Sequence, residues 1–93
     1  MIFVLNKLRD DIFDVIQTLG GPEDKSVLLT SDAVNYATPF MIEKFKPYFV
    51  EDIYVAKDAL EARNIDIAPE CEVVDYDEMV TLLLDEDEKV LAI

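Results

Sequence analysis

The fold of this chain is decided by residues 72–84, Glu72-Val73-Val74-Asp75-Tyr76-Asp77-Glu78-Met79-Val80-Thr81-Leu82-Leu83-Leu84. The β-branched pair Val73-Val74 is typical of a strand, and the residues after Asp75 have the apolar spacing of an amphipathic helix. Asp75 can accept a hydrogen bond from the backbone N–H of Glu78, whose side chain can accept one from the N–H of Asp75. Such a capping box marks a helix start. We therefore predict a strand followed by a capped helix over Tyr76–Leu84. Its buried face is predicted to hold Tyr76, Met79, Val80 and Leu83.

Four similar β-type runs occur elsewhere in the chain. The five predicted strands are Ile2–Leu5, Ser26–Thr30, Ile53–Ala56, Glu72–Asp75 and Val90–Ile93. Helical patterns separate them, and this alternation predicts an α/β fold, a three-layer α/β/α sandwich with a mostly parallel five-stranded sheet. The pattern does not determine the direction of the last strand. Since 93 residues are enough for one small core, we predict a single domain over residues 1–93.

The first helix is predicted from apolar residues that recur at the i, i+3, i+4, i+7 spacing of a buried face. These residues are Ile12, Val15, Ile16 and Leu19. Asp10 or Asp11 is positioned to cap this helix, and Gly20-Gly21-Pro22 is expected to end it.

The second crossover is predicted to contain two short helices, because Pro39 interrupts the pattern and removes an amide donor. Ser31-Asp32 can cap the first of them near Ala33. Thr38 can cap the second, with Pro39 at its first position. The core-facing residues of the second helix are then Met41, Ile42 and Phe45.

The third helix is predicted over Asp58–Arg63, with Asn64 as a left-handed stop and Asp66–Glu70 as a loop. The acidic run Asp85-Glu86-Asp87-Glu88 is expected to be a solvated link to the last strand.

The charge balance is one-sided, with 21 acidic and 8 basic residues. This disfavours direct binding of nucleic acid, which depends on Lys and Arg at the phosphates. We interpret the negative charge mainly as a means of keeping the protein soluble. Binding to a basic partner subunit is the alternative that stays open. The apolar run Met1–Leu5 is too short to span a membrane or to act as a signal sequence. With one cysteine and no disulfide framework, we expect a cytoplasmic protein.

Several classes of chemistry are excluded by composition. The chain has no histidine, so Ser-His and Cys-His catalysis are ruled out. Its two glycines are adjacent, which excludes the dinucleotide fingerprint and the P-loop. The carboxylates of residues 75–78 and 85–88 lack the spacing of a calcium loop and are interpreted as caps and solvated faces. Thr30-Ser31-Asp32, at the carboxyl end of a strand, is likewise interpreted as a cap in preference to a ligand site. We expect no cofactor and no metal.

Cys71 is the one candidate nucleophile and hence the one candidate persulfide carrier. Its neighbours Glu70 and Glu72 would raise the pKa of the thiol and slow its attack. We therefore favour a structural role for Cys71, as a small apolar residue entering a strand, over a catalytic one. Independent enzymatic activity is not expected.

The order of these elements resembles the TusB/DsrH family, small subunits of the DsrE/DsrF/DsrH-like sulfur-relay group. The resemblance runs nearly end to end. It is carried by Ile2-Phe3-Val4-Leu5-Asn6-Lys7, by Val27-Leu28-Leu29-Thr30-Ser31-Asp32-Ala33-Val34, by Ile53-Tyr54-Val55 with Leu60-Glu61-Ala62-Arg63, and by Val73-Val74-Asp75-Tyr76. The resemblance implies a DsrEFH-like sandwich that works with DsrE/TusD-like and DsrF/TusC-like subunits. In such assemblies sulfur passes as a cysteine persulfide toward 2-thiouridine at the tRNA wobble position, or within sulfur oxidation.

Some DsrH-like members carry a cysteine in the first helix. Counted from Asn6-Lys7, that position is Thr18, and counted back from Val27 it is Gln17. Neither residue can form a persulfide, so the resemblance implies an accessory subunit of a TusBCD-type or DsrEFH-type relay. Two alternatives stay open. One is sulfur transfer through Cys71. The other is a homo-oligomeric small-molecule binding module without a sulfur-transfer role, with its pocket beside residues 31–39.

Overall fold

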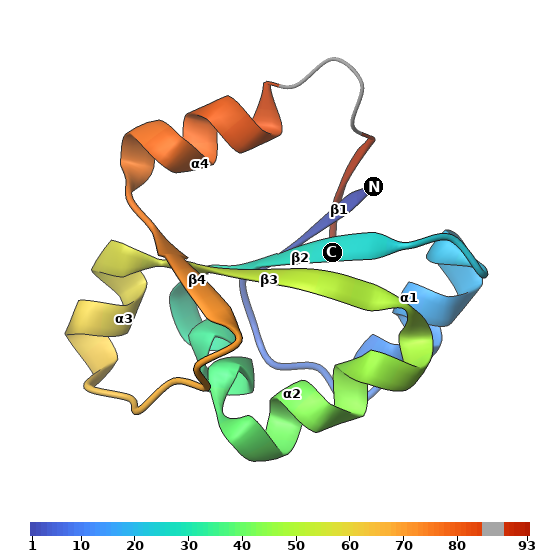
Figure 1. Cartoon of the computed structure of the whole chain (residues 1–93), viewed down its shortest axis with the longest axis horizontal. Coiled ribbons are helices and arrows are strands. Elements are labelled where there is room, and N and C mark those ends of the chain that lie inside the picture. The colour runs from blue at the N-terminus through green and yellow to red at the C-terminus, as the bar shows by residue number, and fades with distance from the viewer. Residues whose placement is uncertain (85–88) are drawn as a thin grey trace.

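The computed structural model describes residues 1–84 and 89–93 and contains one five-stranded sheet in the order β4-β3-β2-β1-β5 (Figure 1). The strands are β1 (Ile2–Leu5), β2 (Lys25–Leu29), β3 (Val50–Ala56), β4 (Cys71–Val74) and β5 (Val90–Ala92). All four neighbouring pairs are parallel, and β5 joins β1 with Phe3 opposite Leu91. The α/β prediction is therefore confirmed, and the direction of the last strand, which the sequence pattern left open, is parallel. The predicted link Asp85–Glu88 lies outside the described residues.

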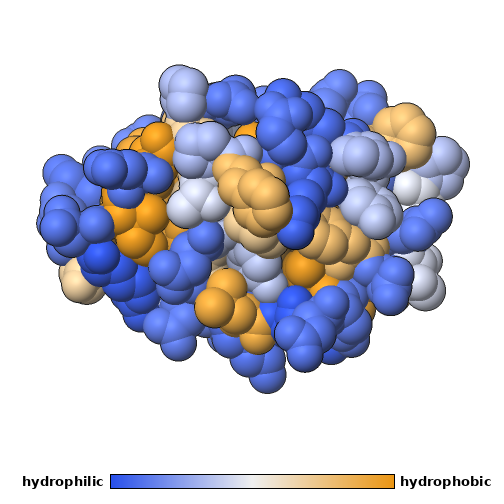
Figure 2. All heavy atoms as spheres, turned by 90° about the horizontal axis from the view of Figure 1, so that it is seen from below, coloured by the Kyte–Doolittle hydropathy of each residue, from blue (hydrophilic) through white to orange (hydrophobic). Residues whose placement is uncertain are grey.

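The helices divide unequally between the two faces of the sheet. One face carries α1 (Ile12–Gly20), α2 (Pro39–Phe45) and α3 (Lys57–Arg63), whereas α4 (Tyr76–Leu83) is the only helix of the described residues on the other (Figure 1). Two 3₁₀ helices, η1 (Ser31–Ala37) and η2 (Lys46–Tyr48), flank α2. Seen from the side of α2, the surface has separate apolar patches among hydrophilic side chains (Figure 2). Among the described residues, no helix has the length and apolar character needed to cross a membrane.

Buried side chains lie on both faces of the sheet, because successive side chains of a strand point to opposite faces. Beneath the sheet, toward α1–α3, a large cluster of buried side chains includes Phe3, Leu5, Val27, Leu29 and Val55. On the α4 side a smaller cluster contains Ile2, Leu28 and Val74. The face covered by α4 is therefore the less enclosed of the two.

The predicted buried face of α1 is rotated in the structure. Ile12 and Ile16 are buried as expected, but Leu19 is half exposed, so its placement in the core was wrong. Phe13 is instead partly buried against the core cluster, and the centroid of its ring lies 5.1 Å from that of Phe45 in an edge-to-face arrangement. The aromatic contact turns the helix toward Phe13, and sequence periodicity alone does not contain that information.

The capping box of α4 is confirmed. The N–H of Glu78 donates to Asp75 Oδ1 at 2.8 Å, and the N–H of Asp75 donates to Glu78 Oε1 at 3.3 Å. The predicted buried face is partly wrong, because the side chain of Tyr76 is 71% exposed. The residues that pack on the sheet are Met79, Leu82 and Leu83.

The break at Pro39 is confirmed, since η1 ends at Ala37 and α2 begins at Pro39. Thr38 occupies the N-cap position of α2 as predicted, but its side chain makes no capping hydrogen bond. Asp11 likewise occupies the N-cap position of α1 as predicted, but its side chain makes no capping hydrogen bond and instead accepts hydrogen bonds from the guanidinium of Arg9. The predicted stop is confirmed, because Asn64 ends α3 in the left-handed conformation with φ 49°.

Candidate functional site

Cys71 is the first residue of β4 and lies beside Ile53 of β3. Its side chain is half-buried and packs against the large core cluster. The thiol Sγ donates a weak hydrogen bond of 3.7 Å to the carbonyl of Ala37, the last residue of η1. The backbone N–H of Cys71 donates to the carbonyl of Ala68 at 3.1 Å. Cys71 thus connects the start of β4 to the helices beneath the sheet.

The surroundings of Cys71 favour the protonated thiol. The pKa of Cys71 is raised to about 11, mainly by burial and to a smaller extent by the adjacent Glu70 carboxylate. The backbone hydrogen bond at Ala68 has a smaller effect that lowers this pKa. Only the thiolate is an effective nucleophile or persulfide acceptor. At neutral pH this cysteine is therefore poorly prepared for sulfur transfer.

The position of the first-helix cysteine falls on the opposite side of the core cluster from β4. Gln17 borders a hollow of about 400 Å³ between the end of α1 and η2, whose walls include Pro22, Tyr48 and Phe49. Thr18, the alternative position, is exposed on α1. Gln17 and Thr18 lie on α1 and Cys71 begins β4, and these two elements lie on opposite sides of the molecule (Figure 1). The structure therefore does not bring the first-helix positions and Cys71 into one site.

The carboxyl ends of β1 and β2 adjoin a segment whose hydrogen bonds were not predicted. Thr30 is the N-cap residue of η1, but its hydroxyl donates to the carbonyl of Leu5 at 3.2 Å and accepts no hydrogen bond from an amide N–H of the helix. Asp32 accepts a 2.8 Å hydrogen bond from the guanidinium of Arg63, the last residue of α3. Because this cation comes from 31 positions away, no local pattern indicates it. Asp32 therefore forms a link between helices, and the expectation that it caps η1 was wrong.

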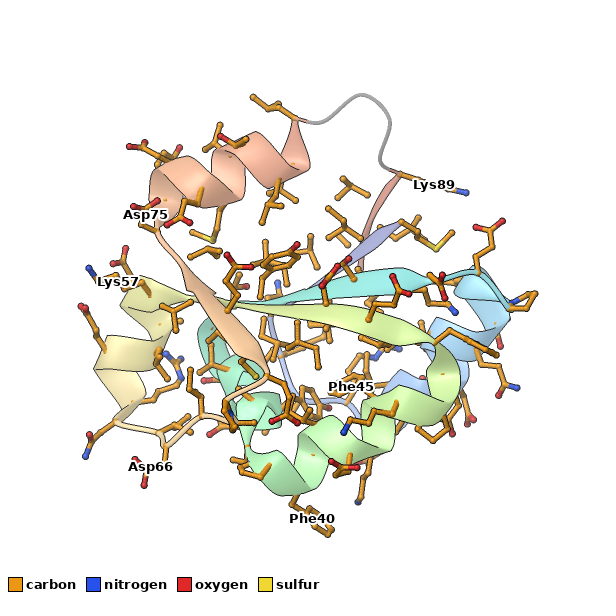
Figure 3. The ribbon with its side chains drawn as sticks, in the orientation of Figure 1. Phe40, Phe45, Lys57, Asp66, Asp75 and Lys89 are labelled. Atoms are coloured by element: carbon orange, nitrogen blue, oxygen red, sulfur yellow. The ribbon has the colours of Figure 1, made fainter. Side chains whose placement is uncertain are left out.

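A second hollow, of about 360 Å³, lies beside the loop that follows β1. Its lining includes Arg9, Phe13, Tyr36 and Lys44. The Tyr36 hydroxyl accepts a hydrogen bond from the N–H of Arg9 at 2.8 Å and donates one to the carbonyl of Arg9 at 2.9 Å, which fixes this loop over η1. Figure 3 shows Phe45 pointing into the space beneath the sheet and Phe40 pointing away from it. The hollow combines cations and aromatic rings, but its lining contains no thiol.

Within residues 1–84 and 89–93, no group of three or more Cys, Asp and Glu side chains is arranged to hold a metal ion. The carboxylates of Asp75 and Glu78 have a structural task in the capping box. The described residues therefore offer no metal centre, and Cys71 is their only thiol.

Comparison with known proteins identifies the family. A family model described as "DsrH like protein" matches residues 8–89. None of the curated proteins matches the chain. Since the matched region covers most of the 93 residues, the chain belongs to the DsrH-like family. At the level of the family it is a sulfur-relay subunit, and members of the family generally act in complexes with DsrE-type and DsrF-type partners.

Proposed function

We propose that this member of the DsrH-like family is an accessory subunit of a relay of the TusBCD or DsrEFH type. In this proposal it supports persulfide transfer between its DsrE/TusD-like and DsrF/TusC-like partners. The relay serves either 2-thiolation of the tRNA wobble uridine or sulfur oxidation, in the cytoplasm. The reacting cysteine belongs to a partner, and this chain contributes the surface on which that partner is held.

The main observation in support of an accessory role is that the thiol of Cys71 is poorly accessible and mostly protonated. Cys71 is half-buried, its pKa is raised to about 11, and its Sγ faces the carbonyl of Ala37. The two first-helix positions, Gln17 and Thr18, bear an amide and a hydroxyl. Since sulfur relay requires an accessible thiolate on the acceptor, these features support a role without covalent chemistry.

The test is to co-express this chain with the DsrE-like and DsrF-like proteins of the same genome, and to purify the assembly by a tag on one partner. A cysteine desulfurase and free cysteine then supply sulfur, and mass spectrometry measures the persulfide on each subunit. We expect co-purification in a fixed ratio, persulfide on a partner cysteine, and unmodified Cys71. The Cys71→Ser variant should support transfer at the same rate within about twofold.

A positive control comes from the chain itself. The variant Thr18→Cys places a thiol on an exposed position of α1, so it reports whether persulfide on this subunit is detectable. Persulfide on Cys71, together with loss of transfer in Cys71→Ser, would instead assign sulfur transfer to this chain. A stable homodimer that binds neither partner would favour the small-molecule binding module. Measurement of 2-thiouridine in tRNA after deletion separates the two relay destinations.

A further inference from the structure

The helix α4 carries more apolar residues than those that pack on the sheet. Met79, Leu82 and Leu83 contact the small core cluster. A second row, Tyr76, Val80 and Leu84, follows at the i, i+4, i+8 spacing that places residues on one side of a helix. Tyr76 is 71% exposed and Leu84 is 72% exposed. We call these three residues the outer row of α4.

The other flank of α4 is hollow and acidic. Between the helix and strands β3 and β4 lies a hollow of about 280 Å³, and Glu72 and Glu78 belong to its lining. The remaining lining residues are Tyr54, Val74, Thr81 and Leu82. This hollow has room for one long side chain, and its two carboxylates suit the charged group of Lys or Arg.

The stretch of sequence that contains α4 carries only negative charge. Residues 64–84 contain six acidic residues and no Lys or Arg. An exposed Tyr and Leu on one flank of α4, with carboxylates on the other, match an interface across the helix whose partner brings both apolar contact and positive charge. We propose that the outer row of α4 and the acidic hollow on its other flank form one docking surface across the exposed side of the helix, for a partner subunit that presents both apolar side chains and a Lys or Arg.

A second copy of this chain is a poor occupant of the same surface. Each copy has a formal net charge of −13, and pairing through α4 would bring two acidic segments together. Like charges at an interface oppose association and select against such a partner. The surface is therefore assigned to a subunit of different composition. The inference rests on the proposed function, because it takes the DsrE-like and DsrF-like proteins as the source of that subunit.

The experiment uses the co-expressed complex and a photo-crosslinking residue at one of two matched positions. Tyr76→p-benzoylphenylalanine places the probe on the outer row, and Phe40→p-benzoylphenylalanine places it on α2, on the opposite face. Tyr76 and Phe40 are both 71% exposed, so exposure alone does not favour either probe. We expect a crosslink to a DsrE-like or DsrF-like subunit from position 76 and none from position 40.

Affinity measurements test the chemistry of the docking surface. Tyr76→Ser should weaken partner binding at least about tenfold, as expected for a central aromatic contact, whereas Phe40→Ser should not. Glu72→Gln should weaken binding about threefold to tenfold. Glu61→Gln makes the same change of charge on exposed α3 and should have no effect. Raising the salt concentration should weaken the wild-type complex and reduce the difference between Glu72→Gln and wild type. Circular dichroism checks that each variant is folded.

The results of these experiments distinguish a failure of the docking surface from a failure of the proposed function. A complex that crosslinks from position 40 but not from 76 overturns the docking surface and leaves the relay role intact. Crosslinks from 76 between two copies of this chain, or an affinity that salt does not change, overturn the assignment to a basic partner. If no complex forms with either subunit, the proposed function and the docking surface fail together.

Discussion

Replacing Gly20 by alanine is expected to destabilise this protein, although alanine is normally the better residue in a helix. Gly20 is the last residue of α1, and an alanine Cβ there would lie 2.0 Å from Cε and 2.7 Å from Cδ of Lys25. Lys25 is 1% exposed. Its ammonium donates hydrogen bonds to the carbonyls of Gly21 at 2.7 Å, Glu23 at 2.6 Å and Tyr48 at 2.9 Å. The side chain that must move is therefore fixed at its far end.

The magnitude follows from this geometry. Ordinary contact begins at 3.4 Å, so Cε of Lys25 must shift by about 1.4 Å, which takes Nζ out of bonding distance of at least one carbonyl. A hydrogen bond to a charged group contributes about 1.5–3 kcal/mol, and a buried cation that loses a partner costs more. The better helix propensity of alanine offsets about 1 kcal/mol. We expect Gly20→Ala to lower the free energy of unfolding by about 1–3 kcal/mol.

Urea denaturation followed by circular dichroism measures this change, and a double-mutant cycle identifies its cause. In a Lys25→Ala background the obstructing atoms are gone, so Gly20→Ala should be neutral or stabilise by up to about 1 kcal/mol. Equal destabilisation in both backgrounds would refute the steric argument, as would a more stable Gly20→Ala protein with Lys25 intact.

Two further predictions concern the cap of α4 and the thiol at the start of β4. Asp75→Ala removes the acceptor of the Glu78 N–H bond and should lower the free energy of unfolding by about 1 kcal/mol, whereas Asp77→Ala, in the same helical turn, should have a smaller effect. At pH 8 the thiol of Cys71, whose pKa is raised to about 11 from 9.0, should react with iodoacetamide about a hundredfold more slowly in the folded protein than in urea. The rate should rise about tenfold per pH unit until pH 11. Because the folded state favours the neutral thiol, this group stabilises the protein below pH 9, and that contribution is lost as pH rises toward 11. Equal rates in folded and unfolded protein would show a freely ionising thiol.

The elements with local determinants were predicted well. The capping box needs only Asp75 and Glu78, three positions apart, and it forms as expected. The break at Pro39 needs only the missing amide, and η1 and α2 are separate helices. The strand β3 starts at Val50, earlier than the predicted Ile53, because Val50 pairs with Lys25 and Asp52 with Ser26 of β2, across a register shift between Lys25 and Ser26. That pairing is a tertiary contact and leaves no local pattern.

The contacts that fix the orientation of helices were not predictable for the same reason. Tyr76 and Leu19 have the spacing of core residues, yet both are exposed, since periodicity identifies an apolar arc without saying how much of it is covered. The burial of Lys25 depends on three backbone carbonyls, one of them at Tyr48, and composition would place any lysine at the surface. Of the two acidic neighbours expected to raise the pKa of Cys71, Glu70 does so and Glu72 does not contribute, and burial raises this pKa more than Glu70 does.

The weak anchoring of α4 connects the stability of this chain to its proposed partner. No side chain of α4 is fully buried, and within residues 1–84 and 89–93 no other helix lies on its face of the sheet (Figure 1). Its packing rests on Met79, Leu82 and Leu83, each only partly buried against the small cluster around Leu28. A subunit seated on the outer row would exclude water from Tyr76 and hold α4 against the sheet. Binding to the folded state alone then stabilises this chain by mass action. In such an assembly a subunit without a reactive thiol still has a defined physical role, which is to present the folded α4 to its partner. The partner in turn stabilises the same helix by binding to it.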